Sequence, residues 1–526
     1  MKTKTTSIKL EFTMISARLL LLILFVCSVG VPFAQNQAPQ ISNFNLSITG
    51  NVLTIQYDLF DFENDDVNVS LHVKNNEEIT YSINTSSATG DLNMVTPGTD
   101  KSIEWNFADE LTYSTDYTIK LVADDMAEID IQSIVNQVDS NNLKSDLEFI
   151  EGIRHRLTGP VHLQETRDFI VQRFTDYGLN STIQDFDLGT YTGKNYIGTK
   201  TGTIDDEYIY ICDAHYDSQT VTPGADDNGS GVVGFLEAAR ILSNYNFKKT
   251  IKFIGFDLEE AGLYGSNAFV QENVSPEEQI AGVLNFEMIG YYTEEPNTQS
   301  LPAGFDLLFP IQYAEIENDS FRGNFIGNFG VVNQNDWELA FDNAAEMYVP
   351  ELKVITFVAP ENWEIVAPDL GRSDHGPFWK ADHPAVMLTG TAEFRNPNYH
   401  LPGDTIGTLN FTFMSNVVKA AVATLAEEAV IHNSSFVEEI IYITITSITE
   451  NGLVKTLKAF PNPVKDIATF SAEEITSFEL YDLMGKLIMR RNSNTIDMTN
   501  LNLGIYFVIG FDKYSNPLYK GKIIKK

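Results

Sequence analysis

Two short apolar stretches that each end in acidic or histidine residues constrain the fold of this chain most strongly. The first, Tyr208–Ala214, is β-prone and leads directly to His215 and Asp217, and the second, Thr250–Phe256, leads to the adjacent pair Glu259–Glu260. Continuously apolar strands are typical of a sheet that is covered on both faces. Because functional groups in open α/β sheets collect where strands end, the pattern predicts that these side chains meet at one edge of a buried sheet.

A glycine-rich turn lies between the two predicted strands. It reads ADDNGSG at residues 225–231 and opens the helical pattern Val232–Leu242. Histidine nitrogen and carboxylate oxygen are ligands that zinc prefers. A two-metal site also needs a carboxylate that bridges ions about 3.5–4 Å apart. Asp226, at the turn, is placed to supply that bridge.

The acidic residues beside the strand ends fit the other roles of such a site. Asp217, two residues after His215, is positioned to orient the imidazole of a ligand. Adjacent residues at a strand end point to different sides, so Glu259 and Glu260 have different roles. One binds metal, and the other is free to take a proton from water. The alternative is that each acid is a solvated loop residue, but the ordered set of ligands argues against it.

The complete set of motifs resembles the co-catalytic di-zinc exopeptidases, which include secreted bacterial aminopeptidases, glutamate carboxypeptidase and, more distantly, glutaminyl cyclase. The resemblance covers roughly residues 130–432. It rests on five motifs in the order of that family: His215-Tyr216-Asp217, DDNGSG at 226–231, EEAGLYGS at 259–266, Asn285-Phe286-Glu287-Met288, and YHLPGDT at 399–405. It implies a mixed β-sheet sandwiched by helices, the zinc exopeptidase fold.

The resemblance also implies a role for each motif residue. Two zinc ions are expected, with Asp226 as the bridge, His215 and Glu287 completing one zinc site, Glu260 and His400 completing the other, and Glu259 as the general base. Position 287 departs from the family pattern, which usually has Asp there. The longer Glu287 side chain is expected to bind metal still, after folding back by one methylene.

Two further residues are candidates for contacts with substrate. Tyr399, beside His400, is positioned to donate its hydroxyl to a developing oxyanion, although a core tyrosine is nearly as good an interpretation. His375, in the segment RSDHGPF at 372–378, either contacts substrate or is a structural loop histidine.

The function expected from this set is that of a secreted zinc metallopeptidase, most simply an aminopeptidase that hydrolyses the N-terminal residues of peptides. Three alternatives stay open: a carboxypeptidase, a glutaminyl cyclase-like enzyme, and a catalytically inactive binding protein. A carboxypeptidase needs a cation for the terminal carboxylate of its substrate, and Arg372 and Arg395 are the obvious candidates. An inactive protein would have no need of Glu259.

The overall charge excludes some partners. The 526 residues contain 72 acidic and 35 basic side chains, which gives a net charge of −37. So acidic a chain argues against nucleic acid and against anionic membrane as partners. It fits an extracellular enzyme whose partners are peptide substrates.

The first 34 residues indicate export. Four basic residues precede the apolar run Leu19–Val29, which is too short for a membrane span, so residues 1–34 are expected to be a signal peptide. Only Cys212 then remains in the mature chain, where no internal disulfide is possible; we expect it in the core. The protein is expected outside the cell or on its surface, after export through the periplasm.

Two β-rich modules are expected to flank the catalytic domain at 130–432. Short alternating runs such as Val52–Tyr57 and Tyr117–Ala123 predict a β-sandwich at 38–127 that resembles immunoglobulin or fibronectin type III modules. Its acidic run at 58–66 is interpreted as a solvated loop, with calcium binding as the alternative. After a linker at 433–455, residues 456–526 resemble the C-terminal sorting domain of type IX secretion substrates, which implies the type IX secretion machinery as a partner.

Overall fold

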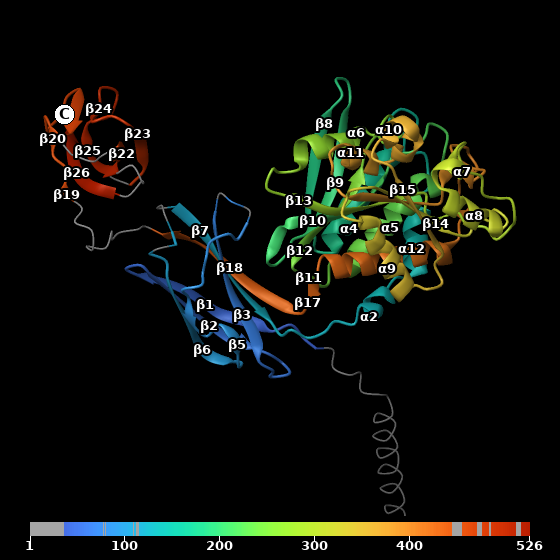
Figure 1. Cartoon of the computed structure of the whole chain (residues 1–526), viewed down its shortest axis with the longest axis horizontal. Helices are drawn as coiled ribbons and strands as arrows, with labels where there is room; N and C mark the ends of the chain where they lie inside the picture. Colours follow the sequence, from blue (N-terminus) through green and yellow to red (C-terminus); the bar gives the residue numbers. More distant parts are fainter. Residues whose placement is uncertain are drawn as a thin grey trace, which may run out of the picture. The chain divides into compact units, whose positions relative to one another are not determined.

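The computed structural model describes residues 36–526 except 77, 79, 109, 112–114, 444–454, 471–475, 483–484 and 512–516. The predicted signal peptide lies outside the described residues. The chain forms two compact units. One contains the β-sandwich and the catalytic domain, and the other contains the C-terminal β-domain (Figure 1).

An eight-stranded mixed sheet forms the centre of the catalytic domain, in agreement with the expected fold. Its strand order is β15-β14-β16-β13-β10-β12-β9-β8. The strands are β8 (Asn180–Asp187), β9 (Thr192–Lys200), β10 (Asp205–His215), β12 (Lys249–Phe256), β13 (Gln279–Glu287), β14 (Ile326–Val331), β15 (Val354–Ala359) and β16 (Ala385–Thr389). The neighbours β12, β10, β13 and β16 run parallel, so their carboxyl ends lie at the same edge.

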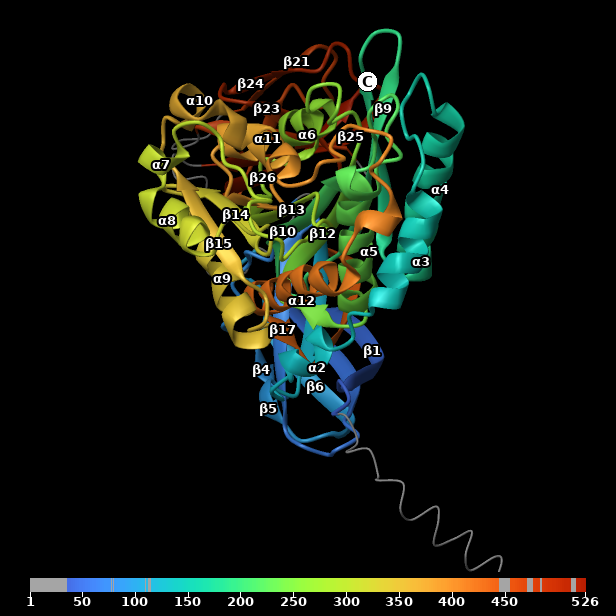
Figure 2. The same cartoon turned by 90° about the vertical axis from the view of Figure 1, so that its right-hand side faces the viewer.

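Helices cover both faces of this sheet, which explains why its central strands are apolar throughout. One face packs against the long helices α3 (Ser140–Ile150), α4 (Pro160–Asp176), α5 (Gly231–Leu242), α9 (Trp337–Tyr348) and α12 (Phe411–Glu428). Figure 2 shows α3, α4 and α5 beside one another. The other face packs against shorter elements: α6 (Tyr264–Ala268), α7 (Phe305–Leu308), α8 (Pro310–Asn318), α10 (Trp363–Val366) and α11 (His375–Lys380).

Local sequence sets where several of these helices begin. Pro160 opens α4, where its fixed backbone angle suits a first helical position. Asn410 caps α12 by accepting the backbone amides of Thr412 and Phe413. Cys212 is a free cysteine that is fully buried in β10, in agreement with the prediction that it lies in the core.

The N-terminal β-sandwich includes a strand that comes after the catalytic domain. One sheet is β1-β2-β6-β4 and the other is β18-β7-β3-β5. The strands are β1 (Gln40–Thr49), β2 (Val52–Phe60), β3 (Val67–Asn75), β4 (Thr89–Gly90), β5 (Asn93–Val95), β6 (Gly98–Asn106), β7 (Thr115–Asp124) and β18 (Ser434–Ile443). Along its full length β18 pairs antiparallel with β7, from Ser434 opposite Asp124 to Ile443 opposite Thr115.

The prediction of a linker at 433–455 is therefore wrong for its first half, which contains β18 (Ser434–Ile443). The segment SSFVEEIIYI reads as polar because Ser and Glu alternate with apolar residues, and that alternation is the mark of a half-buried strand. Val437 and Ile441 pack against the core of the sandwich. The catalytic domain is thus inserted between two neighbouring strands of one sheet.

The C-terminal domain is a separate unit of two small sheets. The larger has the order β19-β26-β25-β22-β23, and the smaller has the order β20-β21-β24. Their strands are β19 (Lys455–Thr456), β20 (Ala459–Phe460), β21 (Ile467–Phe470), β22 (Ser477–Tyr481), β23 (Leu487–Arg491), β24 (Thr495–Asp497), β25 (Gly504–Phe511) and β26 (Pro517–Lys525). Apolar side chains from both sheets, among them Phe470 of β21 and Val508 of β25, form its core.

Candidate metal centre

The carboxyl edge of the central sheet gathers most of the predicted ligands. His215 is the last residue of β10, and Glu287 is the last residue of β13. The pair Glu259–Glu260 follows the end of β12, and His400 lies in the loop after β16. Two groups of side chains have atoms within 4.8 Å of one another and are able to hold a metal ion: His215 with Glu259 and Glu287, and Asp227 with Glu260 and His400.

Asp227, rather than Asp226, is the carboxylate that joins the two groups. Its Oδ1 lies 3.5 Å from Nε2 of His215, and its Oδ2 lies 3.1 Å from Nε2 of His400. Asp226 points away from both histidines. Its carboxylate accepts the backbone amide of Gly290 at 2.8 Å and the side-chain amide of Asn396 at 2.8 Å.

The prediction of Asp226 as the bridge is therefore corrected to its neighbour. The two acids are adjacent, and the turn directs their side chains to opposite sides, so only one of them faces the histidines. Asp404 holds the turn in this orientation, because its two carboxylate oxygens accept the backbone amides of Asp226 at 2.8 Å and of Asp227 at 3.1 Å. Sequence reasoning placed Asp404 within a motif without giving it this role.

The spacing of the remaining atoms fits a pair of zinc sites. Two atoms bound to one zinc at about 2.1 Å in tetrahedral geometry lie about 3.4 Å apart. Nε2 of His215 lies 3.4 Å from Oε2 of Glu287, and Nε2 of His400 lies 3.3 Å from Oε2 of Glu260. Oε1 of Glu260 is buried with no hydrogen-bond donor, as expected of an oxygen that faces a cation.

Glu259 is near the centre but less tightly engaged. Its Oε2 lies 3.8 Å from Nε2 of His215, farther than the carboxylates of Asp227 and Glu287. Burial raises the pKa of Glu259 well above its usual range, and the nearby charge of Glu287 raises that pKa further. A carboxylate with a raised pKa and no close partner is suited to accept and return a proton.

Other carboxylates of the cluster respond to the same environment. Burial raises the pKa of Glu260 to about 7, with the charge of Asp227 adding to the effect. Burial alone lowers the pKa of His400, but Asp227 and Glu260 outweigh it and raise this pKa to about 10. So many acids around two histidines are stable in their ionised form only beside a cation.

The orienting contacts of the ligands come from the surrounding loops. Asp217 lies 3.4 Å from Nδ1 of His215, and its carboxylate also accepts the backbone amide of Glu259 at 3.1 Å. It therefore aligns both a histidine and the neighbouring glutamate. Ser373 donates its hydroxyl to Oε2 of Glu287 at 2.6 Å, a contact that sequence reasoning did not predict.

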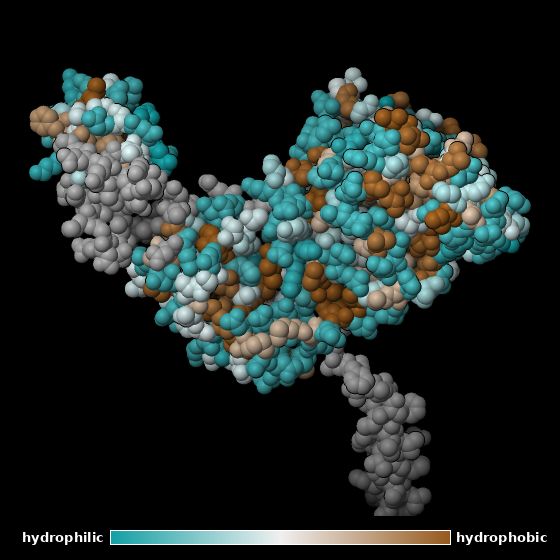
Figure 3. Space-filling model, in the orientation of Figure 1, coloured by the Kyte–Doolittle hydropathy of each residue, from teal (hydrophilic) through white to brown (hydrophobic). Residues whose placement is uncertain are grey.

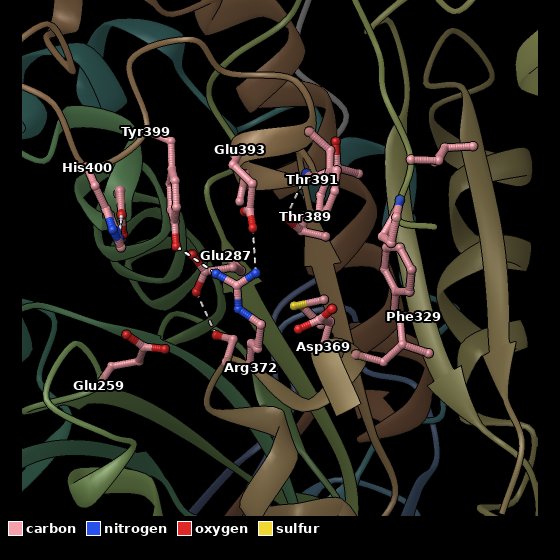
Figure 4. Close-up of a pocket in the computed structure, with 18 of the residues that line it drawn as sticks. Glu259, Glu287, Phe329, Asp369, Arg372, Thr389, Thr391, Glu393, Tyr399 and His400 are labelled. Atoms are coloured by element: carbon pink, nitrogen blue, oxygen red, sulfur yellow. Dashed lines mark hydrogen bonds and ion pairs between the residues drawn. The ribbon is translucent and has the colours of Figure 1, made fainter. Parts of the chain in front are cut away.

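His375 does not face the site, so a contact with substrate is ruled out. Its side chain is fully buried, its Nε2 lies 2.6 Å from the carbonyl of Leu370, and its ring packs edge-on against Trp379. It is a structural histidine within α11. Tyr399, by contrast, stacks on the ring of His400 and lines the cavity next to it (Figure 4).

A cavity of about 100 Å³ opens beside the centre. One wall is apolar and includes Leu301, Pro302, Phe305, Phe329, Leu370, Met387 and Phe394. The opposite wall contains Glu259, Glu287 and Tyr399, with Arg372 reaching toward Glu393 and the Tyr399 hydroxyl (Figure 4). More apolar side chains are exposed on α7, α8 and α10, at Leu307, Ile311 and Ile365, and Figure 3 shows apolar patches over this part of the domain.

Comparison with known proteins agrees with this geometry. The model of "Peptidase family M28" matches residues 195–319. The uncharacterized protein YfbL of Escherichia coli is 32% identical over 314 residues, which cover 56% of this chain and 92% of that protein. The chain belongs to peptidase family M28. It is a zinc-dependent metallopeptidase.

Other relatives of this M28 peptidase carry more specific names. A probable zinc metalloprotease of Pyrenophora tritici-repentis is 25% identical, over 56% of this chain and 68% of its own length. Aminopeptidase YwaD of Bacillus subtilis is 42% identical over 102 residues, 19% of this chain and 22% of YwaD. Among solved structures, the LapA aminopeptidase of Legionella pneumophila aligns with a TM-score of 0.44 at 22% identity, covering 58% of this chain and 78% of LapA.

The end of the M28 peptidase chain has its own match. Residues 458–526 match the model of a "Secretion system C-terminal sorting domain". This is the kind of domain that the sequence predicts at that position, and its presence indicates that the protein is exported. Among the described residues, no helix has the length and apolar character needed to cross a membrane.

Proposed function

We propose that the chain is a secreted di-zinc aminopeptidase that removes apolar residues from the N-termini of peptides. The observation that carries this proposal is the position of Asp227, whose two oxygens each face a different histidine. His215 and Glu287 would hold one zinc, His400 and Glu260 the other, and Asp227 would bind both. When bound, the zinc ions supply Lewis acidity toward water and toward the scissile carbonyl.

The residues of the chain then divide the remaining work. Glu259 accepts a proton from the attacking water at its carboxylate and returns it to the leaving amine. Asp217 keeps His215 and the Glu259 backbone in place through the contacts given above. Tyr399, held beside His400, directs its hydroxyl into the cavity, where it is able to donate to the oxyanion that develops on the substrate.

The charges of the cavity favour a substrate with a free amine. Arg372 is the arginine that lines the cavity, and Glu393 pairs with it at 2.5 Å. Arg395, the other candidate for a carboxylate-binding cation, is 4% exposed and engages Gln299 and the Phe325 carbonyl instead. Because Arg372 is paired with Glu393 and Arg395 does not line the cavity, the acidic wall attracts an ammonium group rather than a terminal carboxylate. The name of the relative YwaD supports the same assignment.

The experiment compares four substrates on the zinc-loaded enzyme, with zinc content measured alongside. We expect two zinc ions per chain and hydrolysis of a leucine anilide, but no hydrolysis of its N-acetylated form. Release of the C-terminal residue from a peptide blocked at its N-terminus would instead establish a carboxypeptidase. Cyclisation of an N-terminal glutamine would establish a cyclase, and two bound zinc ions without any turnover would favour a binding protein.

The role of Glu259 is tested separately by Glu259→Gln. The amide has the same shape but accepts no proton, so kcat is expected to fall by about 10²–10⁴-fold. Zinc content is expected to stay at the wild-type level, because other residues hold the metal. Loss of zinc in this variant would show that Glu259 is a ligand and would contradict its assignment as the base.

The domain limits and the destination of the protein belong to the same proposal. The catalytic domain would span 130–432, and the C-terminal domain would engage the type IX secretion machinery and then be removed. In the native host, an antibody against the catalytic domain is expected to detect protein outside the cell that is shorter than the full chain by about one small domain. Full-length protein retained in the periplasm would contradict this.

A further inference from the structure

The hydroxyl of Tyr399 belongs to a row of three polar side chains along one wall of the cavity. Nη1 of Arg372 donates to Oε1 of Glu393 at 2.5 Å, and Nη2 of the same guanidinium donates to the Tyr399 hydroxyl at 3.1 Å (Figure 4). All three residues line the cavity beside the metal centre. One arginine therefore joins a carboxylate on one side to a phenol on the other.

The three side chains come from separate loops around the carboxyl edge of the sheet. Arg372 precedes α11, Glu393 follows β16, and Tyr399 adjoins His400. The ring of Tyr399 stacks on that of His400, with 3.7 Å between the ring centroids. Stacking fixes the plane of the phenol ring, and the bond from Arg372 fixes the surroundings of its oxygen. The phenol oxygen is thus held in a set position next to a candidate zinc ligand.

The chemistry of this contact decides where the phenol proton points. A guanidinium has only donors, whereas a phenol has one O–H donor and an oxygen that accepts. The Tyr399 oxygen is therefore the acceptor of the bond from Arg372, and its own hydrogen takes no part in that bond. Within the described part of the chain, no side chain or carbonyl accepts this hydrogen. It is free to be donated to an oxygen of a substrate in the cavity, and the bond from a cation makes it a stronger donor.

We infer that Arg372 is a positioning residue, whose guanidinium, held by Glu393, directs the Tyr399 hydroxyl toward the oxyanion of the reaction. The inference rests on the proposed function, in which Tyr399 donates to that oxyanion. The fork of an arginine is rigid and planar, so one arm is able to bind Glu393 while the other binds the phenol. Arg372 acts through Tyr399 and does not itself bind the substrate.

The test is a double-mutant cycle for hydrolysis of the leucine anilide by the full-length, zinc-loaded protein. Tyr399→Phe is expected to lower kcat by about 100-fold, a loss typical of removing one oxyanion donor. Arg372→Met is expected to lower kcat by about tenfold, with KM within about twofold of the wild type, because a contact made in the transition state is weakened. In the double variant, kcat is expected to match that of Tyr399→Phe within about twofold, because Arg372 then has no hydroxyl to direct.

Two further variants separate position from charge. Arg372→Lys keeps the charge but loses the fork, so kcat is expected to lie between those of the wild type and Arg372→Met. Arg322→Met is the matched control, because Arg322 is also a partly exposed arginine, pairs with Asp319 at 3.1 Å and does not line the cavity. It is expected to have wild-type kcat, KM and zinc content.

Binding of leucine phosphonic acid repeats the cycle without turnover. Its tetrahedral anionic group resembles the oxyanion, so its affinity, measured by calorimetry, reports the same contact. Arg372→Met and Tyr399→Phe are each expected to weaken binding by about tenfold or more, and the double variant is expected to bind no more weakly than Tyr399→Phe. This pattern in a protein that does not hydrolyse the anilide would refute the proposed function while leaving the contact between Arg372 and Tyr399 established.

Three results would overturn the inference. Losses that multiply in the double variant would show that Arg372 acts on the substrate directly. A higher KM with unchanged kcat in Arg372→Met would assign it to substrate binding, and full activity in Arg372→Lys would show that the forked contact is not needed. Zinc content is measured in every variant, and loss of zinc from Arg372→Met would assign the residue to the metal centre instead.

Discussion

Both carboxylate oxygens of Asp227 face a histidine, whereas those of Asp226 face amide donors. The two acids therefore make different contributions even though they are neighbours. Asp227→Asn is expected to reduce zinc content below two per chain and to lower kcat/KM by more than about 100-fold, the upper end of the loss typical of residues that only orient ligands. Elemental analysis of the purified protein and anilide hydrolysis measure the two effects.

Asp226→Asn is the matched comparison for this substitution. The variant keeps a side chain of the same size beside Gly290 and Asn396, and it removes no atom that faces either histidine. We expect two zinc ions per chain and a loss of activity of about 10–100-fold, from a less firmly held turn. Loss of zinc in Asp226→Asn with full retention in Asp227→Asn would reverse the assignment.

His375 gives the fold a dependence on pH. Burial lowers the pKa of His375 to about 4, because the ring lies out of water against Trp379. In the unfolded chain the pKa is about 6.5, so the unfolded state binds more protons below that pH. The contribution of His375 to stability is therefore complete above about pH 6.5 and is lost as the pH falls toward 4, up to about 3 kcal/mol.

The comparison of wild type with His375→Gln isolates this effect. Glutamine retains a donor for the Leu370 carbonyl but does not titrate. Urea unfolding at pH 7.5 and at pH 5 is expected to show a smaller loss of stability for the variant than for the wild type. Equal losses in the two proteins would mean that other groups account for the acid sensitivity.

At the scale of elements, the segment between the end of β10 and the turn at 225–230 is held by one buried arginine. Arg154 is fully buried, and its guanidinium donates to the backbone carbonyls of Ile150, Gly152, Tyr216, Pro223 and Gly224. Through these bonds it links the strand that carries His215 to the turn that carries Asp227. The site therefore depends on a residue that contacts no substrate.

Removal of this arginine is expected to be costly. Arg154→Met leaves several buried carbonyls without donors, and we expect the free energy of unfolding to fall by at least about 3 kcal/mol. Arg154→Lys keeps the charge but reaches fewer carbonyls, so an intermediate loss is expected. Denaturant unfolding of the wild type and the two variants measures the three free energies of unfolding. An Arg154→Met variant as stable as the wild type would contradict the role given to the guanidinium.

The carboxyl edge of the sheet was predictable because strand ends and ligands adjoin in the sequence. His215, Glu259 and Glu287 each end or follow an apolar strand, so the parallel sheet brings them together. Which of two adjacent acids faces the site was not predictable, since it depends on the hydrogen bonds that Asp404 makes to the turn. His375 was ambiguous for a similar reason, because burial by Trp379 is decided by tertiary packing.

At the scale of the whole molecule, β18 joins two regions that the sequence keeps far apart. His432 and Asp124, at the two ends of the inserted domain, are 308 residues apart in sequence and lie 3.2 Å apart between Nδ1 and Oδ2. Local patterns predict strands but not partners at such a distance, which is why the sequence alone predicts a linker here.

The pairing of β18 is expected to support the stability of the sandwich. Ile441 packs inward, whereas Ile440 next to it is 59% exposed. Ile441→Asp places a charge against the core and is expected to lower the free energy of unfolding of the sandwich by about 2–4 kcal/mol. Its Tm is expected to fall accordingly. Ile440→Asp introduces the same charge on the outer face and is expected to be nearly neutral. Calorimetric unfolding measures both, and equal Tm values would mean that β18 contributes little.

The position of β18 also bears on the order in which the protein folds as it is made. Ribosomes complete a chain from its N-terminus, so β7 exists long before the strand that pairs with it. Until Ser434 emerges, one edge of β7 remains open, and open strand edges are sites where nascent chains associate wrongly. The sandwich therefore finishes folding after the catalytic domain, even though its other strands are made first.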